Sequence, residues 1–308
     1  MTMMNAMAVH EFGGFENLVP ARIEIREPGE GDVLIRVKAA AVNPADLGMR
    51  DGRYVWPDPV RMPVVPGYDV AGVVEHGTAR FPAGTAVIAY TAHTKTQVGA
   101  YAEFVTLPES LVAEAPGSVD WATAGDEDWG RAAALPLAGL TAQSALARLA
   151  MVAGERLLVN RVSSAVGRFV EQLAKARGVE VVSLEGEGAD AGLVDTRLVD
   201  TGFVDAALDV AGAEAALAAF ARVKDGGRYA TIVPEFWIPG GQFTAARGIE
   251  PVTVFVDETV GSLAELSRSA AQGILRPRIA ALLPLTDAAE AHRRMAAGGA
   301  RGKLILVP

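Results

Sequence analysis

Hydrophobic and polar positions follow two different patterns along the chain. From residue 7 to about residue 106, short apolar runs are separated by turn residues, and residues 33–42 alternate at first and then become wholly apolar. Runs of this length and alternation predict strands, and further strands are expected at residues 70–75, 86–90 and 100–106. We interpret this part of the chain as an antiparallel β-barrel with little helix.

After Trp129 the pattern changes to one of alternating helices and strands. Residues 132–151 carry Ala and Leu at helical spacing. A strand at residues 156–160, a helix at 167–177 and a strand at 179–183 follow. This order is a βαβ unit, which predicts a parallel, doubly wound sheet. Further elements are expected as strands at residues 206–210, 228–233, 251–256 and 302–308 and as helices at residues 214–222, 262–272 and 287–297.

The composition excludes several classes of function. A length of 308 residues favours two domains. The chain has no cysteine, which excludes disulfides, cysteine nucleophiles and thiolate metal sites. Its four histidines are scattered, with no pair at short metal-ligand spacing, so no metal is expected. A formal net charge of -9 disfavours nucleic acid as a partner.

The sequence also bears on the compartment. No apolar run reaches the ~20 residues that a membrane-spanning helix needs. The first residues lack both the basic region and the continuous apolar stretch of a signal peptide. We therefore expect a cytoplasmic protein without a membrane partner.

Four short motifs carry a family resemblance. They are residues 42–46 (Val-Asn-Pro-Ala-Asp), 66–72 (Pro-Gly-Tyr-Asp-Val-Ala-Gly), 135–142 (Leu-Pro-Leu-Ala-Gly-Leu-Thr-Ala) and 301–306 (Arg-Gly-Lys-Leu-Ile-Leu). Each is weak alone, but in this order and at these separations they are specific. Together they resemble the zinc-free branch of the medium-chain dehydrogenase/reductase superfamily, of the quinone oxidoreductase and enoyl reductase type. The similarity covers nearly the whole chain.

The resemblance implies a fold and an activity. The fold is α/β, with a GroES-like β-barrel catalytic domain at residues 1–125 and 258–308. A Rossmann-type domain with a doubly wound parallel sheet occupies residues 126–257. The implied activity is a zinc-independent, NAD(P)H-dependent oxidoreductase that reduces a quinone or an α,β-unsaturated carbonyl compound.

Three residues of the first domain are catalytic candidates. Asn43 and Asp46 come just after a strand, where an amide and a carboxylate can hydrogen-bond a nicotinamide, its ribose or a substrate carbonyl. The alternative is a simple turn in which Asp46 caps a short helix. The phenol of Tyr54 is able to protonate a developing enolate, or else it only packs.

The dinucleotide-binding turn departs from the family pattern. Relatives place small residues where this chain has Arg161, Ser164 and Gly167, because the backbone must approach a pyrophosphate at the helix N-terminus. Arg161 either neutralises a phosphate or fills the space of the dinucleotide. The predicted cofactor contacts are Asn43, Thr141, Arg161, Ser163, Ser164, Ala165, Val166, Gly167, Ser183, Val210, Val233, Phe255 and Lys303.

A second departure follows the strand that ends at Ser183. The glycine-rich residues 184–192 are too short and too poor in helix formers for a full crossover helix, so the helix on the adenosine side is expected to be trimmed. Glu185 and Glu187 disfavour a 2′-phosphate there, so the local charge favours NADH over NADPH unless Arg161 or another distant arginine compensates. The sequence leaves open whether NADPH, NADH or no coenzyme binds. The alternative function is a non-redox cyclase, isomerase or lyase on the same scaffold. A non-catalytic binding protein is the third possibility.

The substrate and the assembly follow from apolar side chains. Trp56, Trp237, Phe236 and Phe255 are candidates to line a site for a small apolar carbonyl or aromatic substrate, although each also suits an ordinary core. The apolar residues 251–256 are expected at the edge of the parallel sheet. An exposed apolar edge invites pairing, so a homodimer joined through this strand is predicted.

Overall fold

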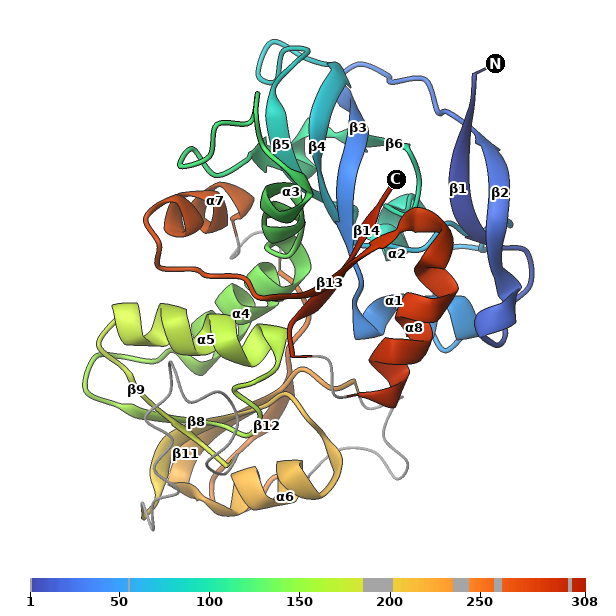
Figure 1. Cartoon of the computed structure of the whole chain (residues 1–308). Helices are drawn as coiled ribbons and strands as arrows, with labels where there is room; N and C mark the ends of the chain where they lie inside the picture. The colour runs from blue at the N-terminus through green and yellow to red at the C-terminus, as the bar shows by residue number, and fades with distance from the viewer. Residues whose placement is uncertain (1, 55, 185–201, 235–243, 258–261, 299–300) are drawn as a thin grey trace. The chain divides into compact units, whose positions relative to one another are not determined.

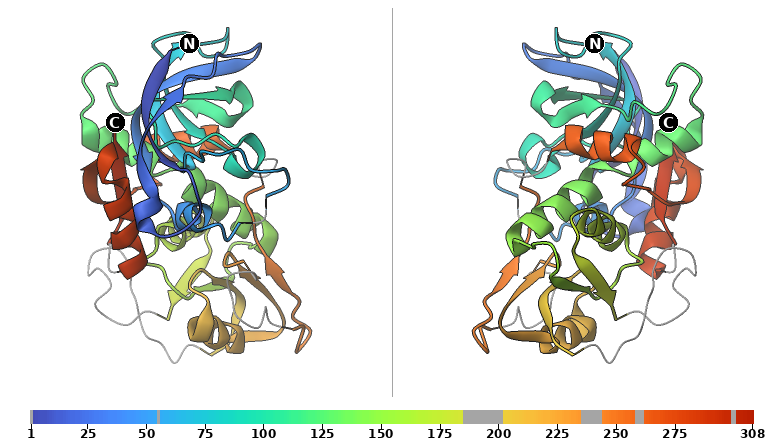
Figure 2. Two further views of the ribbon diagram at one scale, coloured as in Figure 1. Left: turned by 90° about the vertical axis from the view of Figure 1, so that its right-hand side faces the viewer. Right: turned by 90° about the vertical axis from the view of Figure 1, so that its left-hand side faces the viewer.

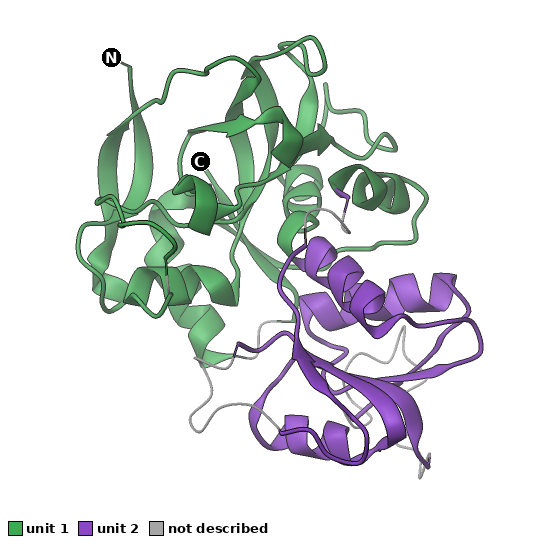
Figure 3. Cartoon of the chain, turned by 180° about the vertical axis from the view of Figure 1, so that it is seen from behind, with its two compact units in different colours: residues 1–137, 263–308 green, residues 138–262 purple. Residues whose placement is uncertain are grey.

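The computed structural model describes residues 2–54, 56–184, 202–234, 244–257, 262–298 and 301–308 (Figure 1). The chain forms two compact units, residues 1–137 with 263–308 (unit 1) and residues 138–262 (unit 2), coloured separately in Figure 3. The predicted domains divide the chain after residues 125 and 257. The unit boundary lies later because α3 (Asp126–Ala133) packs on the strands of unit 1.

Unit 1 contains a seven-stranded sheet and a separate two-stranded sheet among its described residues. The large sheet has the order β13-β14-β3-β4-β5-β7, with β6 also pairing with β3. Its pairs are antiparallel except for β13 and β14, which are parallel. The strands of unit 1 are β1 (Met3–Val9), β2 (Leu18–Glu24), β3 (Asp32–Ala41), β4 (Asp69–His76), β5 (Ala86–Tyr90), β6 (Phe104–Pro108), β7 (Val112–Glu114), β13 (Ile279–Pro284) and β14 (Lys303–Val307).

The central strand β3 shows why the sheet forms. Val33, Ile35 and Val37 alternate inward at its start, and residues 39–41 are buried on both faces, as the sequence pattern predicts. The opposite strand β4 passes so close that Gly72 has no room for a side chain. The last strand, β14, joins β3 with Ile305 opposite Ala41, so the end of the chain completes this sheet.

Helices cover and connect these strands. Those of unit 1 are α1 (Pro44–Asp51), α2 (His93–Thr96), α3, α7 (Leu263–Ala271) and α8 (Ala288–Ala297), with 3-10 helices η1 (Phe15–Asn17), η2 (Glu109–Leu111) and η4 (Leu285–Asp287). The helix predicted at residues 132–151 is confirmed for the most part as α4 (Pro136–Leu149), but its predicted start is wrong. Ala132 and Ala133 belong to α3, and α4 begins at Pro136, which lacks an N–H and is suited to open a helix.

Unit 2 is a parallel five-stranded sheet with the order β12-β11-β10-β8-β9. Besides most of α4, its elements are β8 (Arg156–Val159), α5 (Ala165–Ala176), β9 (Glu180–Ser183), β10 (Val204–Asp209), α6 (Ala213–Ala221), β11 (Val223–Thr231) and β12 (Pro251–Thr253). Figures 1 and 2 show α6 on one face of the sheet and α5 on the other. The α/β fold with a doubly wound parallel sheet is therefore confirmed.

Several predicted strand limits need correction. The strand expected at residues 100–106 begins only at Phe104, because the N–H groups of Ala100 and Tyr101 donate to Gly67 and Pro66 instead. The strand expected at 251–256 ends at Thr253, and the backbone then turns so that the Asp257 N–H donates to Ser144.

Other limits differ less, or cannot be compared. The strand expected at 228–233 begins earlier, at Val223. The trimmed crossover at 184–192 lies, apart from residue 184, outside the described residues.

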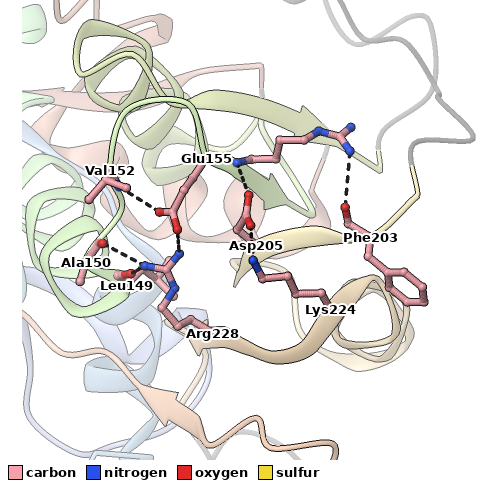
Figure 4. A network of polar contacts seen from close by, with 9 residues as sticks. Leu149, Ala150, Val152, Glu155, Phe203, Asp205, Lys224 and Arg228 are labelled. Carbon is pink, nitrogen blue, oxygen red and sulfur yellow. Dashed lines mark hydrogen bonds and ion pairs between the residues drawn. The ribbon is translucent and has the colours of Figure 1, made fainter.

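A polar network closes the amino ends of the strands of unit 2 (Figure 4). Arg228 donates to the carbonyl oxygen of Ala150 at 2.9 Å and to Glu155 at 2.5 Å. Asp205 pairs with Lys224 at 2.5 Å, and this contact lowers the pKa of its carboxyl group. The charged groups at the amino edge of the sheet are thus bonded to one another or to backbone carbonyl groups. Ligands of open α/β sheets bind at the carboxyl ends of the strands, so a binding site is expected at that edge.

None of the helices in the described ranges is long and apolar enough to cross a bilayer.

The close approach of β3 and β4 yields a stability prediction. A Cβ atom at Gly72 would lie 2.2 Å from the carbonyl oxygen of Arg36. We expect Gly72→Ala to lower the free energy of unfolding by roughly 2 kcal/mol, because the backbone must shift. Gly117→Ala is the control, since nothing lies within 4 Å of that position. Chemical denaturation of both variants measures the difference, and equal stabilities would contradict the close packing.

Candidate functional site

A buried polar cluster surrounds the start of α1 in unit 1. The apolar strand β3 ends at Ala41, and Asn43 then caps the helix, with Pro44 in its first turn. The backbone N–H of Asn43 donates to Oδ2 of Asp46 at 2.8 Å. Asn43 is 3% exposed and Asp46 is fully buried, so both predicted catalytic residues lie beneath the surface.

The amide group of Asn43 is fully engaged within unit 1. Its Nδ2 donates to the carbonyl oxygen of Ala41 at 3.1 Å and to Oδ2 of Asp69 at 2.9 Å. Its Oδ1 accepts a hydrogen bond from Nζ of Lys303, which also lies 3.0 Å from Oδ2 of Asp69. The structure thus brings Asn43 and Lys303 together. Their polar groups form hydrogen bonds with each other and with Asp69.

A chain of hydrogen bonds reaches Asp46 from the other side. Arg50 can only donate, so its contact of 3.5 Å with Nδ1 of His292 makes that nitrogen an acceptor. The hydrogen of His292 is then on Nε2, which lies 3.2 Å from the hydroxyl oxygen of Tyr101. The Tyr101 hydroxyl in turn donates to Oδ2 of Asp46 at 2.9 Å. The direction of every bond follows from Arg50.

Burial governs the protonation of this chain. The pKa of Asp46 is raised from 3.8 to about 7, mainly by burial and also by the nearby charge of Asp69, against hydrogen bonds from Asn43 and Tyr101 that lower it. Burial, together with the charge of Arg50, lowers the pKa of His292 to about 3. The Asp46 carboxyl is therefore poised between its two protonation states near neutral pH, while the His292 ring is neutral.

An aromatic cluster, formed by Tyr54, Trp56, Tyr68, Tyr90 and His93, also belongs to unit 1. Tyr68 stacks on Tyr90 with ring centroids 5.7 Å apart, and the ring of His93 lies 5.3 Å from that of Trp56. Burial raises the pKa of Tyr54 to about 12, although a hydrogen bond with Tyr68 opposes this. The phenol of Tyr54 therefore keeps its proton at neutral pH.

The start of α5 is the candidate phosphate site of unit 2. Ser164 caps the helix, because its Oγ accepts a hydrogen bond from the Gly167 N–H at 3.0 Å. A Cβ atom at Gly167 would lie 2.2 Å from the carbonyl oxygen of Arg161. Within the described residues, no acceptor is recorded for the N–H groups of Ala165 and Val166, as is usual in a first helical turn.

Polar side chains also meet at the carboxyl edge of the parallel sheet. Asp209 accepts hydrogen bonds from Asn160 at 2.5 Å and from Thr231 at 2.7 Å. Asn160 accepts in turn from the N–H of Val210, and Thr231 accepts from the N–H of Val233. The predicted contacts Val210 and Val233 are thus held by this network at the ends of their strands.

The remaining predicted contacts of unit 2 are spread over several elements. Thr141 is buried in α4, and Ser183 is buried at the end of β9. Arg161 and Ser163 are exposed in the turn before α5, and Phe255 is 62% exposed beyond β12.

Some predicted residues cannot be placed. Glu185, Glu187, Phe236 and Trp237 lie outside the described residues.

Several residues of these clusters were not predicted from the sequence. Tyr101 and His292 carry no local motif, and they reach Asp46 only through the fold. Asp69 lies within one of the family motifs, and Asn160 and Asp209 end apolar strands. A rule that examines polar residues at the carboxyl ends of strands would have found Asn160 and Asp209, but not Asp69, which begins β4.

Comparisons with known proteins bear on both units. The family model described as "Alcohol dehydrogenase GroES-like domain" matches residues 29–117, and the one described as "Zinc-binding dehydrogenase" matches residues 180–306. Quinone oxidoreductase of Homo sapiens is 30% identical over 336 residues, which cover 99% of this chain and 98% of that protein. The chain belongs to the medium-chain dehydrogenase/reductase superfamily. The predicted resemblance is confirmed.

Other relatives within the superfamily match in part or in fold alone. "NADPH-dependent alkenal/one oxidoreductase, chloroplastic" of Arabidopsis thaliana is 38% identical over 180 residues, which span 56% of this chain but only 44% of that relative. The solved quinone oxidoreductase from Coxiella burnetii covers 100% of both chains with a TM-score of 0.83 at 22% identity. At that identity the structural match speaks for the fold.

One of the two family descriptions names zinc. The described ranges contain no group of three or more His, Cys, Asp or Glu side chains that could hold a metal ion. Cysteine is absent from the whole sequence.

The buried Asp46 predicts a pH dependence of stability. The folded state keeps the proton up to about pH 7, whereas the unfolded chain releases it near 3.8, so stability is lost as the pH rises between these values. Asp46→Asn mimics the protonated form. We expect its stability relative to the parent protein to rise by about 4 kcal/mol between pH 4 and pH 8.

Denaturation at a series of pH values measures this difference. Asp58→Asn, which alters an exposed carboxylate, is the matched control and is expected to show little change. The difference in the free energy of unfolding between Asp46→Asn and the parent protein is the decisive quantity. If it stayed constant with pH, Asp46 would have the same pKa in the folded and the unfolded chain.

Proposed function

We propose that this protein is a zinc-independent oxidoreductase that uses a nicotinamide coenzyme to reduce a quinone or an α,β-unsaturated carbonyl compound. The names of the human and Arabidopsis relatives support this proposal. The observation that carries it is the start of α5, where Ser164 caps the helix and Gly167 leaves no side chain in the tight turn.

This turn suits a pyrophosphate. The N–H groups of Ala165 and Val166 are available at the positive end of the helix dipole, where an anion is stabilised. The carbonyl group of Arg161, not its side chain, approaches Gly167. Its guanidinium is exposed and makes no ion pair within the described residues. These facts support the interpretation that Arg161 neutralises a phosphate rather than filling the site.

The coenzyme, when bound, supplies a hydride to the carbon conjugated to the carbonyl group. Tyr54 holds a proton on its phenol oxygen, since its pKa is about 12. It is therefore suited to donate a hydrogen bond, or the proton itself, to the oxygen on which negative charge develops. Asn43 and Lys303 have their polar groups engaged with each other and Asp69, so we assign them to positioning.

Coenzyme binding tests the proposal directly. We expect the fluorescence of NADH or NADPH to change on titration with the protein, with micromolar affinity for at least one of them. Gly167→Ala should weaken this binding roughly tenfold or more, because the turn must move. Gly125→Ala, at another helix start with open space around it, should bind like the parent protein. If the fluorescence of neither coenzyme changed up to millimolar concentration, a non-redox enzyme on this scaffold would be favoured.

We also propose that the protein is a homodimer joined through the sheet edge at β12. In the described sheet, β12 is the last strand on its side and pairs only with β11. Phe255, just beyond it, is a large apolar side chain with 62% exposure. An open apolar edge of this kind favours pairing with a second copy.

Light scattering checks the assembly. We expect a mass of twice 32.1 kDa for the parent protein. Phe255→Arg places a charge at the edge and should shift the equilibrium toward the monomer, whereas Phe203→Arg, at another exposed phenylalanine of unit 2, should not. A monomeric parent protein would overturn the proposal.

A further inference from the structure

A groove of about 250 Å³ lies beside the two-stranded sheet of unit 1. Strands β1 and β2, labelled in Figure 1, contribute one side of it. The other side comes from residues 61–65, from residues 96–99 at and beyond the end of α2, and from residues 104–106 of β6. All these residues belong to unit 1, so the groove is distinct from the candidate phosphate site of unit 2.

The wall of this groove is apolar and remains in contact with solvent. Met4 is buried in it, and the side chains that pack around Met4 are only partly buried, namely those of Ile23, Ile25, Val65 and Phe104. Apolar surface that is still exposed to water is stabilised when an apolar group covers it. The wall therefore favours a ligand with a hydrocarbon part.

The charged residues that line the groove are Glu24, Arg26 and Arg61. Successive side chains of a strand point to opposite faces, so the exposed Glu24 points away from the face of Ile23. Arg26 forms an ion pair with Asp32 at 2.9 Å. The guanidinium of Arg61 is exposed and has no recorded ion pair or hydrogen bond in the described ranges. Arg61 is therefore the charge that the groove offers to a ligand, and it calls for an anion.

The backbone that carries Arg61 is held in place by Gln97, which also lines the groove. Oε1 of Gln97 accepts from the N–H of Arg61 at 2.9 Å, and its Nε2 donates to the carbonyl oxygen of Pro59 at 3.1 Å. Only the Arg61 side chain then has to be ordered when an anion binds, which lowers the entropic cost of binding.

We propose that this groove binds an aliphatic carboxylate of medium chain length, with its hydrocarbon chain on the apolar wall and its carboxylate paired with Arg61. A guanidinium pairs with a carboxylate through two parallel hydrogen bonds. Met62, 43% exposed, also lines the groove, and its unbranched side chain adapts to the shape of a ligand. This binding goes beyond the proposed reduction, because it needs neither the coenzyme nor a hydride.

The size of the groove sets the length of the chain. A water molecule takes up roughly 30 Å³ in the liquid, so the groove holds about eight groups of that size, and a methylene group is similar in size. Octanoate is therefore the probe of choice.

Calorimetric titration of the full chain with octanoate tests the proposal. We expect binding in the submillimolar range. Octylammonium, which has the same chain and the opposite charge, should bind at least roughly tenfold more weakly. Butanoate should bind about a hundredfold more weakly, because it lacks four of the methylene groups that cover the wall.

Two arginine variants separate the role of Arg61 from that of general surface charge. Arg61→Gln should weaken octanoate binding roughly tenfold. Arg26→Gln is the matched control, since Arg26 lines the same groove but is already paired with Asp32, and it should bind octanoate like the parent protein.

Methionine methyl resonances locate the ligand. Octanoate should shift the carbon–proton signals of Met4 and Met62, which line the groove, and leave that of Met295 in α8 unchanged.

Four outcomes would overturn the proposal. They are the absence of octanoate binding at millimolar concentration, equal binding of octanoate and octylammonium, unchanged affinity of Arg61→Gln, and binding that leaves the Met4 and Met62 signals in place. The comparison of the two ligands uses the parent protein, so it decides the matter even if a variant fails to fold. None of these results depends on whether the protein reduces a carbonyl compound.

Discussion

Several elements of unit 1 meet at the buried contact between the Lys303 ammonium and the Asp69 carboxylate. Their side chains are only 6% and 0% exposed, and charges at such depth persist only when their remaining polar atoms are satisfied. Asn43 bonds to both partners, and the backbone N–H of Leu137 donates to the other Asp69 oxygen at 2.6 Å. One ion pair thereby fixes the last strand, the start of α1 and the start of α4. Loss of either charge would leave the other buried without compensation.

The same contact sets the state of the second buried carboxyl. Lys303 contacts Asp69, so its charge is the weakest of the influences on Asp46, which accepts hydrogen bonds from Asn43 and from the Tyr101 end of the chain that begins at Arg50. Burial outweighs these bonds and raises the pKa of Asp46 to about 7. Among the described residues no cation is in direct contact with Asp46, so burial decides its protonation.

Periodicity along the chain was enough to predict most strands and the change from an antiparallel to a parallel sheet. It failed at Pro136, where a local backbone rule overrides a good helical pattern, and at Thr253, where a contact with Ser144 redirects the chain. The site was only partly predictable. Asn43 and Asp46 follow a strand and attract attention, but His292 is separated from Tyr101 by 191 residues. Such contacts are a product of tertiary packing, and no local spacing encodes them.

Polar groups that are already hydrogen-bonded within the protein are less able to bind a ligand. The amide of Asn43 and the ammonium of Lys303 were predicted to contact the coenzyme. Asn43 already forms hydrogen bonds with Ala41, Asp69 and Lys303. Among the described residues, the buried side-chain atoms that lack a hydrogen-bond partner are Oδ1 of Asp46, Nε1 of Trp56 and Nδ1 of His93. A change in the contacts among Asn43, Asp69 and Lys303 is therefore expected to act on stability, because these buried polar groups depend on one another for their bonds.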